Sequence, residues 1–107
     1  MALEAGVEVM LGSDMPPFWE FEGTTATVRE LEWMIEGGLA PAAALQAATI
    51  VPARWLGADA DVGTVEVGKR ADLVALAADP LADRTAWRTI GLVMNGGQVV
   101  RNDGWAR

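Results

Sequence analysis

Asp14 is the side chain of this sequence whose position most clearly indicates chemistry. It follows an apolar run at residues 7–11 and the pair Gly12-Ser13, and a proline-rich turn begins directly after it. This order predicts a carboxylate at the carboxyl end of a buried strand, where barrel enzymes place their reacting groups. The sequence contains no histidine and no cysteine, and catalytic metal sites usually take several ligands. Asp14 therefore represents one piece of an active site without the rest.

Two other interpretations of the acidic residues near this point remain open. Asp14 could cap a turn through its own backbone, as aspartate often does before a proline-rich loop. Glu20 and Glu22 could form the paired carboxylates of a glycosidase, although solvated loop acids are the commoner case.

The loop after Asp14 supplies candidates for substrate contact. Pro16, Phe18 and Trp19 follow it closely, and loops at this face of a barrel line the substrate site. Phe21 extends the aromatic group. The alternative is that these aromatic side chains pack on the barrel rim or on a neighbouring subunit.

Composition narrows the classes of partner. The net charge is −7, and residues 1–53 carry all of it, because acids and bases balance in residues 54–107. An acidic chain without a basic stripe argues against nucleic-acid binding and against anionic membrane surfaces. The lack of cysteine, of a basic apolar leader and of an apolar run of about 18 residues predicts a cytoplasmic protein without a membrane span.

Helices must follow the first strand. Thr27-x-x-Glu30 has the form of a capping box, which predicts a helix start at Thr27, and Gly37-Gly38 would end that helix. Pro41 predicts the start of a second, alanine-rich helix, and a third begins near Pro52. The apolar face of the first helix comprises Val28, Leu31, Met34 and Ile35.

A small antiparallel sheet is expected after residues 57–63. Alternation at residues 63–67 predicts a strand, and residues 71–76 predict a nearly all-apolar one. Residues 89–94 and 98–101 flank Asn95-Gly96-Gly97, which is a strong hairpin signal. The chain therefore divides into residues 1–57 and residues 58–107.

Several side chains outside these motifs have defined expectations. Trp33 and Trp55 lie on or beside apolar helical stripes, which predicts packing roles. Trp87 and Trp105 fall in a loop and a tail, where exposure would indicate an interface. Asp72 is expected to bond nearby backbone or to pair with a neighbouring base.

An ordered series of short motifs runs along nearly the whole chain. They are Ala5-Gly6-Val7 leading to Gly12-Ser13-Asp14, Arg29-Glu30-Leu31, Glu36-Gly37-Gly38-Leu39-Ala40-Pro41-Ala42-Ala43-Ala44-Leu45, Ala48-Thr49-Ile50-Val51-Pro52-Ala53-Arg54-Trp55-Leu56-Gly57, Gly63-Thr64-Val65-Glu66-Val67-Gly68-Lys69-Arg70-Ala71-Asp72-Leu73-Val74, Asp79-Pro80-Leu81 and Val93-Met94-Asn95-Gly96-Gly97-Gln98-Val99-Val100. In this order they resemble the carboxyl-terminal part of metal-dependent amidohydrolases, and the imidazolonepropionase-like and prolidase-like members most closely.

The resemblance implies an α/β fold. Residues 1–57 would be the last strand and following helices of a (β/α)8 TIM-like barrel. Residues 58–107 would be the carboxyl-terminal strands of a small β-sandwich that is built from both chain ends. The implied activity is hydrolysis of amide or cyclic amide C–N bonds in a small-molecule substrate by a metal-activated water.

The resemblance also implies a role for Asp14, which matches the family's strand-eight aspartate. That residue contacts zinc or another divalent metal and accepts a proton from the bound water. The family's remaining ligands are a His-x-His pair, a lysine or acid, and further histidines on earlier strands, whereas this sequence has no histidine. The chain is therefore expected to be inactive alone, as a fragment of the enzyme.

Two alternatives to an enzyme fragment stay open. The chain could be a non-catalytic module that oligomerises, or a subunit that completes a barrel supplied by another chain. Self-association is expected in isolation, because a barrel strand without neighbours leaves edges unpaired and apolar helix faces exposed.

Overall fold

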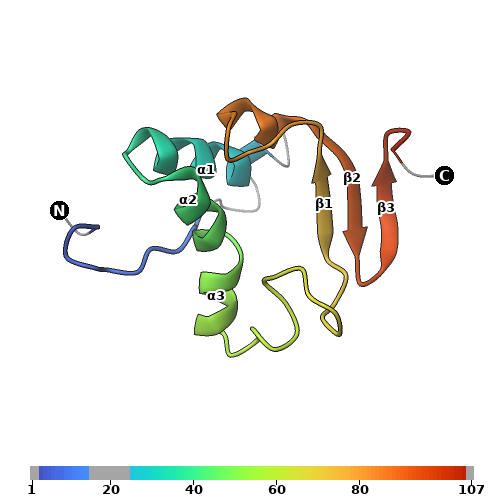
Figure 1. Ribbon diagram of the computed structural model, residues 1–107, viewed down its shortest axis with the longest axis horizontal. Coiled ribbons are helices and arrows are strands. Elements are labelled where there is room, and N and C mark those ends of the chain that lie inside the picture. Colours follow the sequence, from blue (N-terminus) through green and yellow to red (C-terminus); the bar gives the residue numbers. More distant parts are fainter. Residues whose placement is uncertain (1–2, 15–24, 106–107) are drawn as a thin grey trace.

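The helices and the sheet occupy opposite ends of the molecule (Figure 1). The computed structural model describes residues 3–14 and 25–105, and its principal extents are 47 × 33 × 33 Å. An α/β chain with a small antiparallel sheet is thus confirmed, as the order of elements along the sequence predicts. No helix in the described ranges has both the length and the apolar character needed to cross a bilayer.

Three short helices follow one another in the first half. They are α1 (Thr25–Glu36), α2 (Pro41–Ala47) and α3 (Ile50–Trp55). Pro41 opens α2 as predicted, because the first helical position needs no backbone N–H. The capping-box prediction is wrong: α1 already includes Thr25, so Thr27 lies inside the helix.

The core is small and joins the helices to the second half of the chain. Leu31 of α1 and Ala44 of α2 pack with Trp87, and all are at least nine-tenths buried. Val28 and Ile35 of α1 pack against this cluster, which confirms the predicted apolar face. The prediction for Trp87 is wrong, because the 3-10 helix η1 (Arg84–Arg88) turns its indole into the core.

The sheet consists of β1 (Leu73–Leu76), β2 (Ile90–Asn95) and β3 (Gln98–Asn102) in the order β1-β2-β3, with both pairs antiparallel. Asn95 pairs with Gln98, so Gly96 and Gly97 form the turn. Their φ angles of 57° and 83° are those of a hairpin turn that glycine adopts without strain. The hairpin prediction is confirmed.

The predicted strand at residues 63–67 does not form. These residues take part in no ladder among the described elements, and Val65 and Val67 are 84% and 108% exposed. A two-residue alternation gives a strand only where another strand offers its backbone, and none lies beside this segment in the described part of the chain.

The predicted buried strand at residues 7–11 is also wrong. The segment belongs to no described sheet, and Val7 and Met10 are 55% and 44% exposed. Exposure still alternates from Glu8 to Asp14, with Val9, Leu11 and Ser13 half-buried. A strand of a parallel sheet is normally covered on both faces and paired on both edges, and neither condition is met here.

The tryptophans of the helices are not packed as predicted. Trp33 and Trp55 are 56% and 68% exposed. The guanidinium of Arg29 lies 5.9 Å from the centre of the Trp33 ring, and Trp55 Nε1 donates to Glu8 Oε2 at 3.2 Å. Trp105, in the tail, covers Gly91, where a Cβ would overlap its indole.

Candidate functional site

Asp14 lies at the end of the extended segment that the sequence analysis singles out. It is exposed, and its φ of 46° makes it the one non-glycine residue with a positive φ in the described ranges. Aspartate enters this left-handed region more readily than most residues. The backbone therefore turns sharply at the carboxylate, a conformation that recurs at functional sites.

Two contacts hold this segment on the helices. The backbone N–H of Leu11 donates to the carbonyl oxygen of Ala47 at 2.9 Å, and Ala47 is 2% exposed at the end of α2. Further back, the carboxylate of Glu8 accepts the hydrogen bond from Trp55 of α3. The small side chain of Ala47 permits this close approach, so α2 and α3 determine where Asp14 lies.

The donors for a catalytic metal are incomplete in the described ranges. No group of three or more histidine, cysteine, aspartate or glutamate side chains is placed there to hold an ion. Asp14 would supply one carboxylate, which fits one position of a divalent site and no more. The chain's described residues therefore do not fit a complete catalytic metal centre.

The candidates for substrate contact, Pro16, Phe18 and Trp19, lie outside the described residues. The same holds for Phe21 and for the acidic pair Glu20 and Glu22. Their proximity to Asp14 stays a prediction from the sequence.

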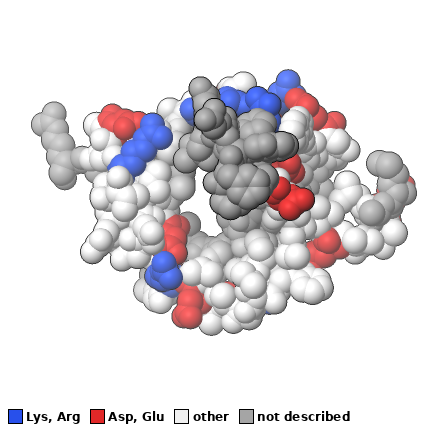
Figure 2. Space-filling view, turned by 180° about the vertical axis from the view of Figure 1, so that it is seen from behind, with Lys and Arg blue, Asp and Glu red and all other residues white. Residues whose placement is uncertain are grey.

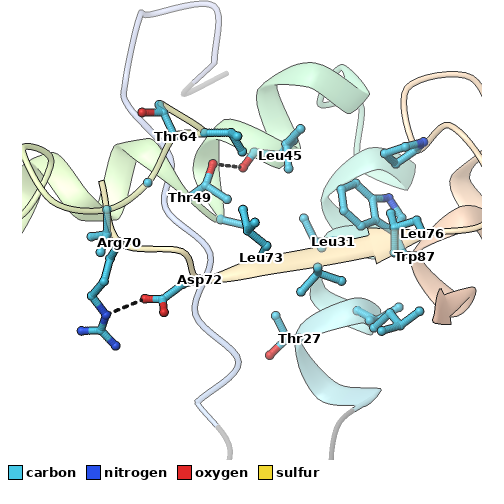
Figure 3. A pocket seen from close by; sticks show the side chains of 18 of the residues that line it. Thr27, Leu31, Leu45, Thr49, Thr64, Arg70, Asp72, Leu73, Leu76 and Trp87 are labelled. Atoms are coloured by element: carbon cyan, nitrogen blue, oxygen red, sulfur yellow. Dashed lines mark hydrogen bonds and ion pairs between the residues drawn. The ribbon is translucent and has the colours of Figure 1, made fainter. Parts of the chain in front are cut away.

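A cavity of about 770 Å³ lies between the helices and the sheet. Figure 2 shows the molecule hollowed between these two halves. The side chains of Leu31 and Leu45 approach it from the helices, and those of Leu73 and Leu76 from β1, as Figure 3 shows. Most of the wall is apolar, and Arg70 and Asp72 lie at the edge of the cavity and pair with each other at 3.2 Å.

Trp87 also lines this cavity, and its indole N–H lacks a partner. The residue is 8% exposed, and no acceptor within the described part of the chain reaches Nε1. A buried donor without an acceptor costs about 1–3 kcal/mol. Sequence reasoning missed this site because its walls come from segments far apart in the chain, and no local motif marks them.

Ion pairs connect α1 to η1 above the core. Arg88 donates from Nε and from a terminal nitrogen to the two carboxylate oxygens of Glu32, both at 2.7 Å. The Arg88 hydrogen bond and charge lower the pKa of Glu32, although partial burial opposes them. Arg84 and Glu36 form a looser parallel pair at 3.2 Å.

Asp72 has a structural role, as predicted. Its Oδ1 accepts the backbone N–H of Gly96 at 2.6 Å, while Oδ2 pairs with Arg70. The backbone N–H of Gly97 donates in turn to Ala71 at 3.0 Å. The segment before β1 therefore braces the turn of the hairpin.

Comparison with known proteins shows what this arrangement is similar to. The model of the Amidohydrolase family matches residues 1–100. An imidazolonepropionase of Rubrobacter xylanophilus is 37% identical over 94 residues, which cover 88% of this chain and 21% of that protein.

Solved structures agree with the sequence match. A candidate prolidase from Bifidobacterium longum is 43% identical with a TM-score of 0.81, over 99% of this chain and 26% of that one. A Xaa-Pro dipeptidase with methionine in its active site is 30% identical with a TM-score of 0.83, over 94% and 24%. Molinate hydrolase is 31% identical with a TM-score of 0.74, over 91% and 24%.

The chain thus spans about a quarter or less of the length of these relatives. Its whole described extent aligns with them, including the extended segment before Asp14 and the small sheet. On the family match and on these likenesses, the chain belongs to the Amidohydrolase family.

Proposed function

We propose that this chain is the carboxyl-terminal part of a hydrolase that cleaves amide or cyclic amide C–N bonds in a small-molecule substrate. Membership of the Amidohydrolase family supports this, as do relatives named as an imidazolonepropionase and a Xaa-Pro dipeptidase. Residues 1–57 would belong to the barrel of that enzyme, and residues 58–107 to its small β-sandwich.

Asp14 is the residue of this chain proposed to act in the reaction. Zinc or another divalent metal, when bound in the complete enzyme, would acidify a water molecule. Asp14 would contribute one ligand and accept a proton as the water attacks the carbonyl carbon. The other ligands must come from residues outside this chain, because the described residues offer no set that could hold a metal.

One observation supports this role for Asp14 more than any other. The carboxylate is exposed at the end of an extended segment, on a backbone with a φ of 46°, and α2 holds that segment through Leu11. A turn-capping aspartate would also tolerate this φ, so a test must separate reaction from folding.

The two alternatives differ from this proposal in their demand for metal. A subunit that completes another chain's barrel would bind zinc only with that chain, and the open cavity and exposed apolar residues favour some completion of this kind. A non-catalytic module would bind none under any condition. A cytoplasmic location and self-association remain part of the proposal.

A chimera tests the role of Asp14. This chain would replace the matching carboxyl-terminal region of the Bifidobacterium longum protein, to which it is 43% identical. We expect zinc-dependent dipeptide hydrolysis, and we expect Asp14→Asn to lower kcat about 10²- to 10⁴-fold, the usual range for a lost acid–base group. Glu8→Gln is the matched control, because Glu8 is an exposed acid of the same segment.

Steady-state rates and metal content by plasma mass spectrometry would be read on the same samples. An Asp14→Asn chimera that folds and hydrolyses at the rate of its parent would contradict the proposal. The isolated chain of 107 residues should bind no stoichiometric zinc and show no hydrolysis.

A further inference from the structure

The cavity between the helices and the sheet contains a hydrogen-bond donor that nothing uses. Trp87 is 8% exposed, lines the cavity, and has no acceptor for Nε1 within the described residues. Buried donors in folded proteins nearly always have a partner. The indole therefore indicates that an acceptor belongs in this cavity in the functional state.

The same cavity borders an unpaired strand edge. β1 pairs only with β2 in the described sheet, so alternate N–H and C=O groups of Leu73–Leu76 have no ladder partner on the other side. Leu73 and Leu76 line the cavity, and β1 contacts η1, which carries Trp87. The unused indole N–H and the free edge thus belong to one region, which Figure 3 shows.

The charges at the cavity do not call for a charged ligand. Arg70 is paired with Asp72 at 3.2 Å and also donates to Asn95 at 3.3 Å. The rest of the wall is mainly leucine, valine and alanine. An occupant should therefore be apolar, neutral where it meets the wall, and able to present carbonyl oxygens.

We propose that the cavity receives an extended apolar segment of polypeptide, which adds to the free edge of β1 and accepts the Trp87 Nε1 hydrogen bond with a main-chain carbonyl. The source would be the part of the longer amidohydrolase that lies outside this chain, since the relatives are about four times as long. Strand addition to an open edge combines main-chain hydrogen bonds with side-chain pockets. The proposal rests on the proposed function only in taking this chain as part of that longer enzyme.

Peptide binding to the ¹⁵N-labelled chain tests this. Overlapping synthetic peptides would cover the part of the Bifidobacterium longum chain that this one does not match. We expect one apolar peptide to shift the Trp87 indole ¹H–¹⁵N resonance downfield and to slow amide exchange in β1. The resonances of the exposed Trp33 and Trp55 should stay unchanged.

Variants separate the hydrogen bond from general apolar binding. Trp87→Phe keeps an aromatic ring and removes the donor, so the Kd should rise about fivefold, the effect of one neutral hydrogen bond. Because Trp87 also packs in the core, a second pair avoids it. Val65→Asp should weaken binding, since Val65 lines the cavity, whereas Val67→Asp should not, since Val67 does not; both side chains are more than four-fifths exposed.

Several outcomes would overturn the inference. No peptide binds at millimolar concentration; or binding leaves the Trp87 resonance in place; or Val65→Asp and Val67→Asp behave alike. A Trp87 shift that depends only on chain concentration would assign the cavity to a second copy instead. Binding of the neutral ketone dye prodan without any peptide would indicate a small-molecule site.

The hydrolase proposal fails separately. Peptide binding requires neither metal nor Asp14, which does not line the cavity, so Asp14→Asn should bind the same peptide. An inactive chimera with intact peptide binding would count against hydrolysis alone.

Discussion

Individual side chains in this chain connect segments that are distant in sequence. Glu32 and Arg88 are 56 residues apart, and two hydrogen bonds of 2.7 Å join them. The Glu32 side chain is 19% exposed and that of Arg88 47%, so solvent screens the pair only in part. Arg88 lies next to Trp87 in η1, and the pair therefore helps to keep the indole over the core.

This ion pair predicts a pH-dependent stability. The pKa of Glu32 is lowered below its usual 4.5, first by the hydrogen bond from Arg88. A lowered pKa in the folded state stabilises the fold above the usual value, and that stabilisation is lost as pH falls through the lowered pKa. Glu32→Gln should cost about 0.5–1 kcal/mol at neutral pH, and nothing at a pH where Glu32 is protonated in the parent chain.

Urea unfolding of both proteins across the acid range measures this difference. Glu36→Gln is the matched control, because its pair with Arg84 at 3.2 Å is longer and both side chains are more than half exposed. An equal loss for the two variants, or a Glu32→Gln loss that persists in strong acid, would show that the pair does not act in this way.

At the level of elements, local signals were sufficient where the partner lay close in sequence. Pro41 determines the start of α2, and Gly96-Gly97 determines the hairpin, because each acts on its own backbone. The strands expected at residues 7–11 and 63–67 have the right alternation and no ladder. A strand requires a neighbour, and periodicity within one segment carries no information about it.

Helix α2 offers a direct test of packing. Ala44 is fully buried between α1 and η1, whereas Ala42 is exposed on the same helix. Ala44→Leu should destabilise the fold by about 1–3 kcal/mol through overpacking, and Ala42→Leu by less than about 0.5 kcal/mol. Thermal unfolding followed by circular dichroism measures both, and equal melting temperatures would refute the packing assigned to Ala44.

The whole molecule exposes more large apolar side chains than a self-sufficient domain of this size normally would. Trp33, Trp55 and Leu56 are 56%, 68% and 82% exposed on the helical half, and Val99 and Val100 are 49% and 62% exposed on β3. The edge of β3 is also unpaired in the described sheet. Surfaces of this kind in longer relatives are available to be covered by the rest of the protein.

The isolated chain should therefore self-associate. We expect sedimentation velocity to show concentration-dependent species larger than a monomer, and we expect bound hydrophobic dye. Replacing both Trp33 and Trp55 with glutamate should reduce the association, because it removes apolar area and adds charge. A compact monomer that binds no dye would contradict this prediction.

The sequence by itself determined the family, the position of Asp14 and the order of helices before strands, because ordered motifs and local turn chemistry are properties of contiguous residues. It also determined that the chain lacks histidine for a metal site. Only the tertiary structure decided that Trp87 is buried, that Trp33 and Trp55 are exposed, and that a cavity with an unused N–H separates the helices from the sheet. Burial depends on which distant segments meet, and those contacts, such as Trp87 with Leu31 and Ala44, leave no trace in local periodicity.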